Sequence, residues 1–204
     1  MSTYLENSPR PAIALSSKAK AEKGFTIIEL LMVLAIMSIA FGTIYKSFEQ
    51  LNRSYTTENV KAGVQQGARI AVELMVQDIR LAGLNPLGTA SAGVMATVPL
   101  PTSNWIEFTA DMNYDGEIVA TDPFETIKYN LVGRELKQTN HIGEETLLDN
   151  VTNLSFTFLD ADDVATTTNS EIRSVTISLT MEKPAGRAGP ISRTYTTTVR
   201  CRNL

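Results

Sequence analysis

Hydrophobic side chains dominate one long stretch near the start of the chain. From Phe25 to Tyr45 the sequence holds a single charged residue, Glu29. At about 1.5 Å per residue, a helix over this stretch is about 30 Å long, which matches the hydrocarbon core of a bilayer. The pattern therefore predicts an apolar helix at residues 25–45 that is long enough to cross a membrane.

An amphipathic pattern follows over residues 46–84. Apolar residues recur at steps of three and four, which is the spacing of one face of a helix. The stripe slips around residues 56–59, so we expect the two parts of one long helix to pack against different partners. The first stripe is Ile44, Phe48, Leu51 and Tyr55, and the second is Val60, Val64, Ala68, Ala71, Met75, Ile79 and Ala82.

The end of this helix is expected at Gly83, just before Pro86. Glycine suits the left-handed cap position, and proline lacks the amide hydrogen that would continue the helix. Gly63 and Gly67 lie inside the helix, where each glycine costs about 1 kcal/mol relative to alanine. We therefore expect a packing reason for both, such as the close approach of a strand or of a neighbouring helix.

Short runs with alternating polar and apolar residues dominate the rest of the chain, after a loop rich in small residues and proline at 85–104. Such alternation is typical of an antiparallel sheet with one buried face, and the second helical stripe is its expected cover. The predicted fold class is α+β, with a long N-terminal helix packed on an antiparallel β-sheet in a domain of residues 85–204. The expected strands are 105–108, 127–131, 134–138, 154–158, 175–180 and 195–199.

Composition and charge narrow the classes of partner. The 204 residues carry a formal net charge of −4, which argues against nucleic acid as a partner. Lys18, Lys20 and Lys23 precede the apolar stretch, so the positive-inside rule keeps that end in the cytoplasm and exports the rest. The chain has one cysteine, Cys201, and an intramolecular disulfide is therefore excluded.

The junction between the polar start and the apolar stretch carries a motif. Lys23 and Gly24 stand before Phe25, and Glu29 is the fifth residue counted from that phenylalanine. A carboxylate inside a membrane-length apolar helix is a functional-site hypothesis by default. This combination resembles the N-terminus of type IV prepilins, the family of pilins and type II secretion pseudopilins.

The resemblance implies a maturation pathway. Residues 1–24 correspond to a leader that a prepilin peptidase removes after Gly24. Phe25 becomes the first mature residue and is N-methylated, and Glu29 pairs with the N-terminal amine of a neighbouring subunit. The resemblance also implies a pilin-like fold and, as partners, other major and minor pilin subunits, an inner-membrane assembly platform and the membrane. Two departures stand out: the leader is long and mostly polar, and position 46, where major pilins usually carry a kinking proline, is Lys46.

A second, weaker resemblance lies at residues 78–83, which are similar to the end of the long helix in minor pilins of the PilW kind. Together with Lys46 and the loop-rich domain, it favours a minor type IV pilin. Such a subunit primes or joins pilus assembly from the inner membrane, where it is a single-pass protein with its domain outside the cytoplasm, and then enters the fibre.

Several alternatives stay open. One is a type II secretion pseudopilin of the J kind, which shares the first motif and would join a pseudopilus. Another is an exported, membrane-anchored calcium-binding adhesive domain, for which Glu29 would be dispensable. The apolar stretch could also be an ordinary signal anchor, or a cleaved secretory signal with its cut near Ser38-Ile39-Ala40.

The loop at 111–125 has the spacing of a calcium site. Oxygen-bearing side chains stand at loop positions 1, 3 and 5, glycine at position 6 and a carboxylate at position 12, as in an EF-hand loop. The flanking segments read as strands, and the residue at position 12 is an aspartate, whose shorter side chain leaves the bidentate contact to Glu125. The predicted Ca²⁺ ligands are Asp111, Asn113, Asp115, Glu117 through its backbone oxygen, Asp122 and Glu125.

No pattern in the chain indicates an enzyme. The single histidine, His141, lies in a predicted turn, and no serine or cysteine stands in a nucleophile motif beside it. Clusters of His and Cys with zinc spacing, and glycine-rich phosphate loops, are absent from the sequence. We therefore expect a non-enzymatic protein, in which no residue is assigned a catalytic role.

Overall fold

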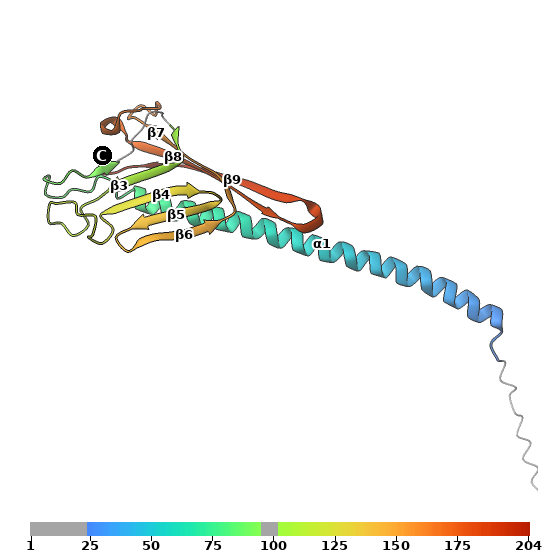
Figure 1. Cartoon of the computed structure of the whole chain (residues 1–204). Helices are drawn as coiled ribbons and strands as arrows, with labels where there is room; N and C mark the ends of the chain where they lie inside the picture. The colour runs from blue at the N-terminus through green and yellow to red at the C-terminus, as the bar shows by residue number, and fades with distance from the viewer. Residues whose placement is uncertain (1–23, 95–101) are drawn as a thin grey trace, which may run out of the picture. The chain divides into compact units, whose positions relative to one another are not determined.

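The computed structural model describes residues 24–94 and 102–204 (Figure 1). The chain divides into two compact units, Met1–Phe48 and Glu49–Leu204. The predicted leader, apart from Gly24, and its three lysines lie outside the described residues. Helix α1 (Ile27–Ile79) belongs to both units.

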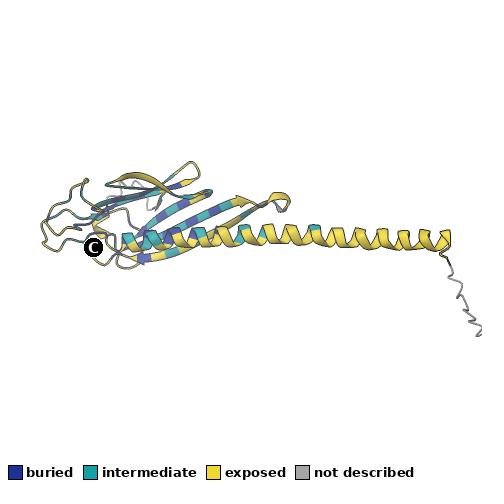
Figure 2. Cartoon of the chain, turned by 90° about the horizontal axis from the view of Figure 1, so that it is seen from below, coloured by how far each residue is buried: buried dark blue, intermediate teal, exposed yellow. Residues whose placement is uncertain are grey.

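The described part of the first unit is the start of helix α1. By its length and apolar composition, this helix is able to cross a membrane. Every described side chain from Gly24 to Phe48 is exposed, including the apolar ones (Figure 2). A largely apolar exposed surface of this kind is the surface that a helix presents to lipid or to other helices, because in water it would be costly.

In the second unit, helix α1 turns one face into a hydrophobic core. Its buried residues are Val64, Ala68, Ala71, Val72, Met75 and Ile79, which confirms most of the second predicted stripe. Leu51 and Tyr55 of the first stripe remain exposed. The slip predicted near residues 56–59 therefore separates a part of the helix that this chain covers from a part that it leaves open.

Two antiparallel sheets follow the helix, where a single sheet was predicted. The first has the order β1-β3-β4-β5-β6 and the second the order β2-β7-β8-β9. The chain leaves the first sheet after β6 at Asn150, whose φ of 64° redirects the backbone, and β7 then pairs with β8. The strands are β1 (Gly93–Val94), β2 (Thr102–Ser103), β3 (Trp105–Thr109), β4 (Thr126–Val132), β5 (Glu135–Asn140), β6 (Gly143–Asp149), β7 (Val151–Leu159), β8 (Ser174–Pro184) and β9 (Pro190–Arg200), with 3-10 turns at Asn169–Glu171 and Gly186–Ala188.

The core lies where the helix meets both sheets. Its largest fully buried side chains come from all three, among them Met75, Tyr129, Phe156 and Phe158. A Cβ atom at Gly67 would lie 3.2 Å from Leu148 of β6 and 3.4 Å from Met181 of β8. The predicted packing reason is confirmed for Gly67, because this glycine lets the helix approach both sheets closely. At Gly63 a Cβ would meet nothing within 4 Å in the described chain, so no strand approaches it there, and the approach of a neighbouring helix stays a prediction.

The helix ends earlier than predicted and more gradually. After Ile79 the backbone tightens, with Leu81 N donating to Asp78 O and Ala82 N donating to Ile79 O. Gly83 then takes a φ of 81°, and its N–H donates to Thr109 O of β3 at 3.0 Å. The glycine therefore acts as the expected left-handed cap, and its amide ties the helix end to the first sheet.

Strand β6 is absent from the sequence-based prediction. Its adjacent Glu144 and Glu145, and its adjacent Leu147 and Leu148, break the alternation that marks a strand. In the structure, Leu136 pairs with Leu148 but Lys137 pairs with Thr146, so Leu147 is the extra residue of a bulge. An edge strand with a bulge does not need strict alternation, which is why the pattern concealed it.

Candidate functional site

The predicted cleavage and methylation site lies at the start of helix α1. Gly24 and Phe25 precede the helix, and Phe25 is 91% exposed. Three hydrogen bonds join Thr26 and Glu29, two donated by Thr26 and one by Glu29. Thr26 donates to Glu29 Oε2 from its backbone N–H at 2.9 Å and from its hydroxyl at 2.9 Å, while Glu29 N donates to Thr26 Oγ1 at 3.3 Å.

This arrangement is a capping box, in which Thr26 is the N-cap and Glu29 is the third residue of the helix. It satisfies backbone donors that would otherwise be unpaired at a helix start. It also fixes the direction of the Glu29 carboxylate, since one oxygen accepts both bonds from Thr26. Both bonds from Thr26 go to Oε2, which leaves Glu29 Oε1 for another donor.

Hydroxyl groups in the apolar part of the helix are bonded to its own backbone. Ser38 Oγ donates to Leu34 O at 2.7 Å, Thr43 Oγ1 donates to Ala40 O at 2.8 Å, and Ser47 Oγ donates to Thr43 O at 3.0 Å. In lipid an unpaired hydroxyl is costly, and this internal pairing removes that cost. The segment is therefore compatible with an apolar surrounding despite its polar residues.

The predicted metal loop brings three of its carboxylates together. Asp111, Asp115 and Glu125 each offer an oxygen, and these oxygens all lie within 4.8 Å of one another. The side chain of Asp111 is fully buried and accepts bonds from the N–H groups of Tyr114, at 2.7 Å, and Gly116, at 3.0 Å. The loop backbone thus holds the first carboxylate in place.

Glu125 carries an unpaired oxygen in this cluster. Its side chain is fully buried, and Oε2 accepts the N–H of Val119 at 2.8 Å, whereas the buried Oε1 has no hydrogen-bond partner among the described residues. A buried carboxylate oxygen without a partner is unfavourable unless a cation or a donor reaches it. Together with Asp111 and Asp115, it forms a set of hard oxygen ligands of the kind that Ca²⁺ prefers.

The remaining predicted ligands, Asn113, Glu117 and Asp122, are outside this group of three carboxylates. The side-chain amide of Asn113 donates to Asp115 Oδ2 at 2.9 Å and to Asp122 Oδ2 at 3.0 Å, and so lies between two carboxylates. The N–H of Glu117 donates to Asp115 Oδ1 at 2.9 Å. Asp122 is therefore joined to the loop through Asn113, and it is outside the group of three converging carboxylates.

Thr89, which is distant in the sequence, supports the metal loop, and this contact was not predicted from the sequence. Thr89 Oγ1 donates to Gly116 O at 2.9 Å, and a Cβ atom at Gly116 would lie 2.3 Å from that hydroxyl oxygen. Gly116 has a φ of 87°. The glycine at loop position 6 is thus required both by the turn and by the close approach of Thr89.

A buried polar cluster joins the helix to the first sheet and was also missed. The Tyr129 hydroxyl donates to Asp78 Oδ2, and Gln138 Nε2 donates to the same oxygen at 3.1 Å and to Tyr129 Oη at 2.8 Å. Burial raises the pKa of Asp78, and the bonds from Tyr129 and Gln138 offset part of this rise. Burial, with the nearby Asp78 charge, also raises the pKa of Tyr129.

His141 lies in the predicted turn, between β5 and β6. Its Nδ1 accepts the N–H of Phe124 at 3.3 Å, and the two rings meet edge to face with centroids 4.8 Å apart. The histidine therefore joins this turn to the end of the metal loop.

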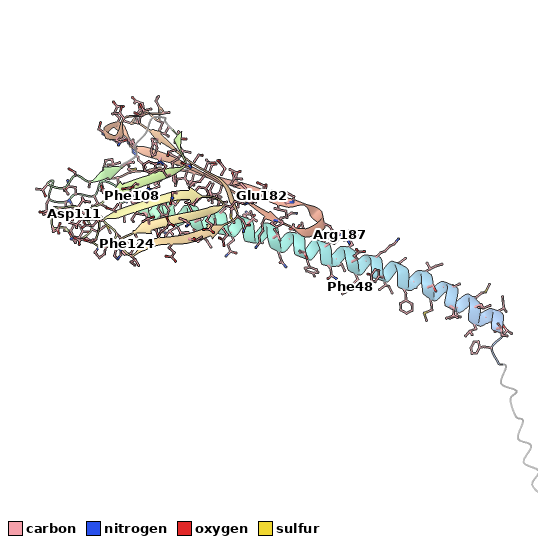
Figure 3. The ribbon with its side chains drawn as sticks, viewed as in Figure 1. Phe48, Phe108, Asp111, Phe124, Glu182 and Arg187 are labelled. Carbon is pink, nitrogen blue, oxygen red and sulfur yellow. The ribbon has the colours of Figure 1, made fainter. Side chains whose placement is uncertain are left out.

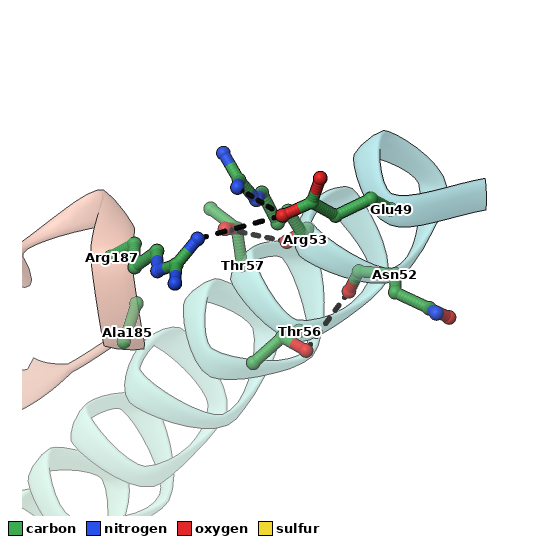
Figure 4. Close-up of a pocket in the computed structure, with 8 residues that line it drawn as sticks. Glu49, Asn52, Arg53, Thr56, Thr57, Ala185 and Arg187 are labelled. Atoms are coloured by element: carbon green, nitrogen blue, oxygen red, sulfur yellow. Dashed lines mark hydrogen bonds and ion pairs between the residues drawn. The ribbon is translucent and has the colours of Figure 1, made fainter. Parts of the chain in front are cut away.

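A cleft of about 590 Å³ lies between the helix and the tip of the β8–β9 hairpin (Figure 4). Glu49 Oε1 forms ion pairs there with Arg53 and, at 3.5 Å, with Arg187. The hydroxyl groups of Thr56 and Thr57 donate to backbone oxygens of the helix. Two guanidinium groups thus share one carboxylate oxygen in this cleft.

Comparison with known protein families gives one match. Residues 19–45 match the prokaryotic N-terminal methylation motif. A search of curated proteins found no match. The matched segment contains Gly24, Phe25, Glu29 and the apolar start of helix α1.

This motif implies processing by a prepilin peptidase and assembly with other pilins. With the long apolar helix, it fits a single-pass inner-membrane anchor and a place in a pilus fibre. The α+β architecture of a long N-terminal helix followed by antiparallel sheets is pilin-like. The chain therefore carries the prepilin-type methylation motif on a pilin-like fold, which supports a type IV pilin-like or pseudopilin-like protein.

Proposed function

We propose that this chain is a minor type IV pilin, a structural subunit that primes or joins pilus assembly from the inner membrane. The observation that carries the proposal is Glu29, the lone carboxylate of residues 25–45, which lies within the methylation motif and at the start of a membrane-length apolar helix. Lys46 in place of a kinking proline and the similarity of residues 78–83 to the PilW kind favour a minor over a major subunit.

Each of the residues at the helix start would have a separate role in assembly. Cleavage after Gly24 frees the amine of Phe25, which is methylated. The capping box keeps Glu29 Oε2 on Thr26, so Oε1 is the oxygen that meets the amine of a neighbouring subunit. Pairing two charges offsets the desolvation that each suffers in lipid, and removing one partner leaves the other buried and unpaired.

A J-type pseudopilin of type II secretion remains the alternative within the same family. Secretion genes beside this gene would favour it, and pilus retraction genes would favour a pilin. A membrane-anchored adhesive domain is the alternative outside the family, and it requires neither cleavage nor Glu29.

The decisive test is the intact mass of membrane-extracted protein, together with fibre formation by a Glu29→Ala variant. We expect a mature chain that begins at Phe25 and carries one added methyl group, and we expect the variant to lose fibres. A chain that begins near Phe41 would indicate a secretory signal. An uncut chain that tolerates Glu29→Ala would leave a plain membrane anchor.

We also propose that the loop at 111–125 binds Ca²⁺. Glu125 supports this proposal, because its buried Oε1 lies beside Asp111 and Asp115 and lacks a partner in the described part of the chain. These three carboxylates would hold the ion, with Asn113, the backbone oxygen of Glu117 and Asp122 as the further predicted ligands. The ion would cross-link the loop and order it, so its role is structural.

Calcium binding is testable on the full-length protein in detergent. Thermal unfolding in CaCl₂ and in EGTA should differ, since a ligand at a hundred times its Kd adds about 2.7 kcal/mol to the free energy of unfolding. Glu125→Gln should abolish the shift, whereas Glu117→Gln, which changes an exposed side chain, should retain it. Equal melting temperatures with and without millimolar calcium would rule the site out.

A further inference from the structure

Two aromatic residues of the loop 111–125 have a backbone conformation that bulky side chains rarely adopt. Tyr114 has a φ of 64° and Phe124 a φ of 61°. The other non-glycine residues with positive φ in the described chain, Asn150 and Asp163, are of types that tolerate it. Strain of this kind persists where the surroundings enforce it, and it gathers at functional sites.

The strained backbone leaves both aromatic rings in solvent. Tyr114 is 59% exposed and Phe124 is 45% exposed. Ile142, next to the His141 ring that contacts Phe124, is 80% exposed, and Leu87, whose side chain lies against Gly116, is 59% exposed. Single exposed apolar residues are ordinary, but several around one loop indicate a contact surface.

The same surface is acidic, because Asp115 and Glu117 are exposed and Asp122 is half-buried, whereas Asp111 and Glu125 are buried. Residues 111–125 hold five carboxylates, Asp111, Asp115, Glu117, Asp122 and Glu125, and no lysine or arginine. One divalent cation would neutralise only two of these charges, so an excess of negative charge remains. We call this loop and its exposed apolar side chains the acidic end of the second unit.

The tip of the β8–β9 hairpin carries positively charged side chains. Residues 183–193 hold Lys183, Arg187 and Arg193 and no carboxylate. Arg187 is 80% exposed and lines the cleft with Arg53, where both share Glu49 (Figure 4). Figure 3 shows Asp111 and Phe124 at one end of the sheets and Arg187 at the other. We call this hairpin tip and its cleft the basic end.

We propose that the second units of two copies of this chain dock head to tail, with the acidic end of one copy on the basic end of the next. Opposite charges select this orientation, since two acidic ends or two basic ends repel each other. The exposed ring of Tyr114 or Phe124 enters the cleft, where guanidinium groups favour aromatic faces. The proposal rests on the assembly function proposed above and adds to it a contact outside the membrane segment.

Such a contact joins two different surfaces, so it does not close on itself. A docked pair leaves one acidic and one basic end free, and further copies are able to add in the same direction. This property suits a subunit of a fibre and distinguishes the contact from a symmetric dimer.

Disulfide trapping tests the contact on the full-length chain in detergent, with Cys201→Ser as the background. We expect the double variant Thr121→Cys/Ser192→Cys, with one cysteine at each end, to give a ladder of multimers under mild oxidation. A mixture of the two single variants should give a cross-linked dimer of one copy of each variant, and no longer multimers. The control pair Thr121→Cys/Thr198→Cys, whose second cysteine lies on the face of β9, should give no ladder. A ladder of equal intensity from the control, or none from the test pair, would overturn the proposal.

A charge swap tests the selectivity. Arg187→Glu should lower the multimer yield by about tenfold, and adding Glu117→Lys in the same chain should restore it, because attraction replaces repulsion. Circular dichroism of each variant checks that it is folded. If cross-links formed in cells only to a different subunit, the choice of a second copy would be wrong. Since the assay uses the uncut chain, it is independent of cleavage at Gly24 and of Glu29, so its failure would leave the proposed function standing.

Discussion

At the scale of single residues, Thr26 is the side chain whose role the sequence concealed. The prepilin resemblance drew attention to Gly24, Phe25 and Glu29, and the threonine between them had no assigned role. In the structure it donates twice to one oxygen of Glu29 and accepts from its backbone N–H. Thr26 is therefore a positioning residue for the carboxylate that the proposed assembly depends on.

This role predicts a graded effect of substitution. Thr26→Val removes the hydroxyl that donates to Glu29 and accepts from its N–H. A lost N-cap typically costs about 1 kcal/mol of helix stability, so we expect fibre yield to fall by about fivefold. Thr26→Ser keeps the hydroxyl and should retain most fibres. Electron microscopy and immunoblotting of sheared fibres, normalised to mature subunit in the membrane, measure the effect. Fibre loss in Thr26→Ser, with fibres retained in Thr26→Val, would show that the methyl group matters and the capping box does not.

Asp78 joins the helix to the first sheet, and no local sequence pattern predicts this role. It is one polar residue near the end of a helix, and its partners Tyr129 and Gln138 lie on two different strands. Only the fold brings the three together. The raised pKa of Asp78 has a definite consequence for stability.

We predict that stability conferred by Asp78 falls as pH rises. A group whose pKa is raised on folding contributes stability below its ordinary pKa and loses it as the pH passes the raised pKa. As the pH rises above about 4, near the ordinary aspartate pKa, the native chain should therefore lose stability relative to Asp78→Asn. Tyr129→Phe removes a donor to the carboxylate and should steepen this loss. Chemical denaturation at a series of pH values measures it, and parallel curves for native chain and Asp78→Asn would contradict the assignment.

At the scale of elements, the long helix was the most predictable part of the chain. Its second stripe is buried as expected, because a periodicity of 3.6 residues sustained over many turns has few other interpretations. Most strands were likewise found from alternation. The short β1 and β2 were missed because two residues carry no pattern, and β6 was missed because of its bulge.

Gly63 inside the helix and Gly83 at its C-terminal cap allow two contrasting substitutions. Gly63→Ala should stabilise the isolated chain by about 1 kcal/mol, because alanine favours the helix and its Cβ meets nothing. Gly83→Ala should destabilise it by about 1–3 kcal/mol, because φ is 81° and the new Cβ would lie 2.9 Å from Asn203 O. Urea unfolding of both variants in detergent measures the changes, and a stable Gly83→Ala chain would show that the helix end readily rearranges.

At the scale of the whole molecule, the sequence predicted the architecture better than its assembly. An antiparallel α+β fold followed from the periodicities, but the split into two sheets depends on a turn at Asn150 that no hydrophobic pattern encodes. In the metal loop, spacing indicated the ligand types. The convergence of Asp111 and Asp115 with Glu125, and the separate position of Asp122, depend on tertiary contacts such as that between Thr89 and Gly116. Local spacing is a property of the chain, whereas convergence is a property of the fold.

The single thiol of the chain has one more consequence. Cys201 is 4% exposed, its N–H donates to Arg173 O at 2.9 Å, and burial raises the pKa of its thiol to about 11. Thiol reagents attack the thiolate, so near neutral pH this residue should react only when the end of the chain detaches. We predict labelling about a thousandfold slower than in denaturant, which mass spectrometry over time would measure. A fast reaction under native conditions would mean that this end frays freely; a slow one would make the native cysteine a built-in chemical reporter, able to show without any engineered probe whether incorporation into a fibre tightens or loosens the domain.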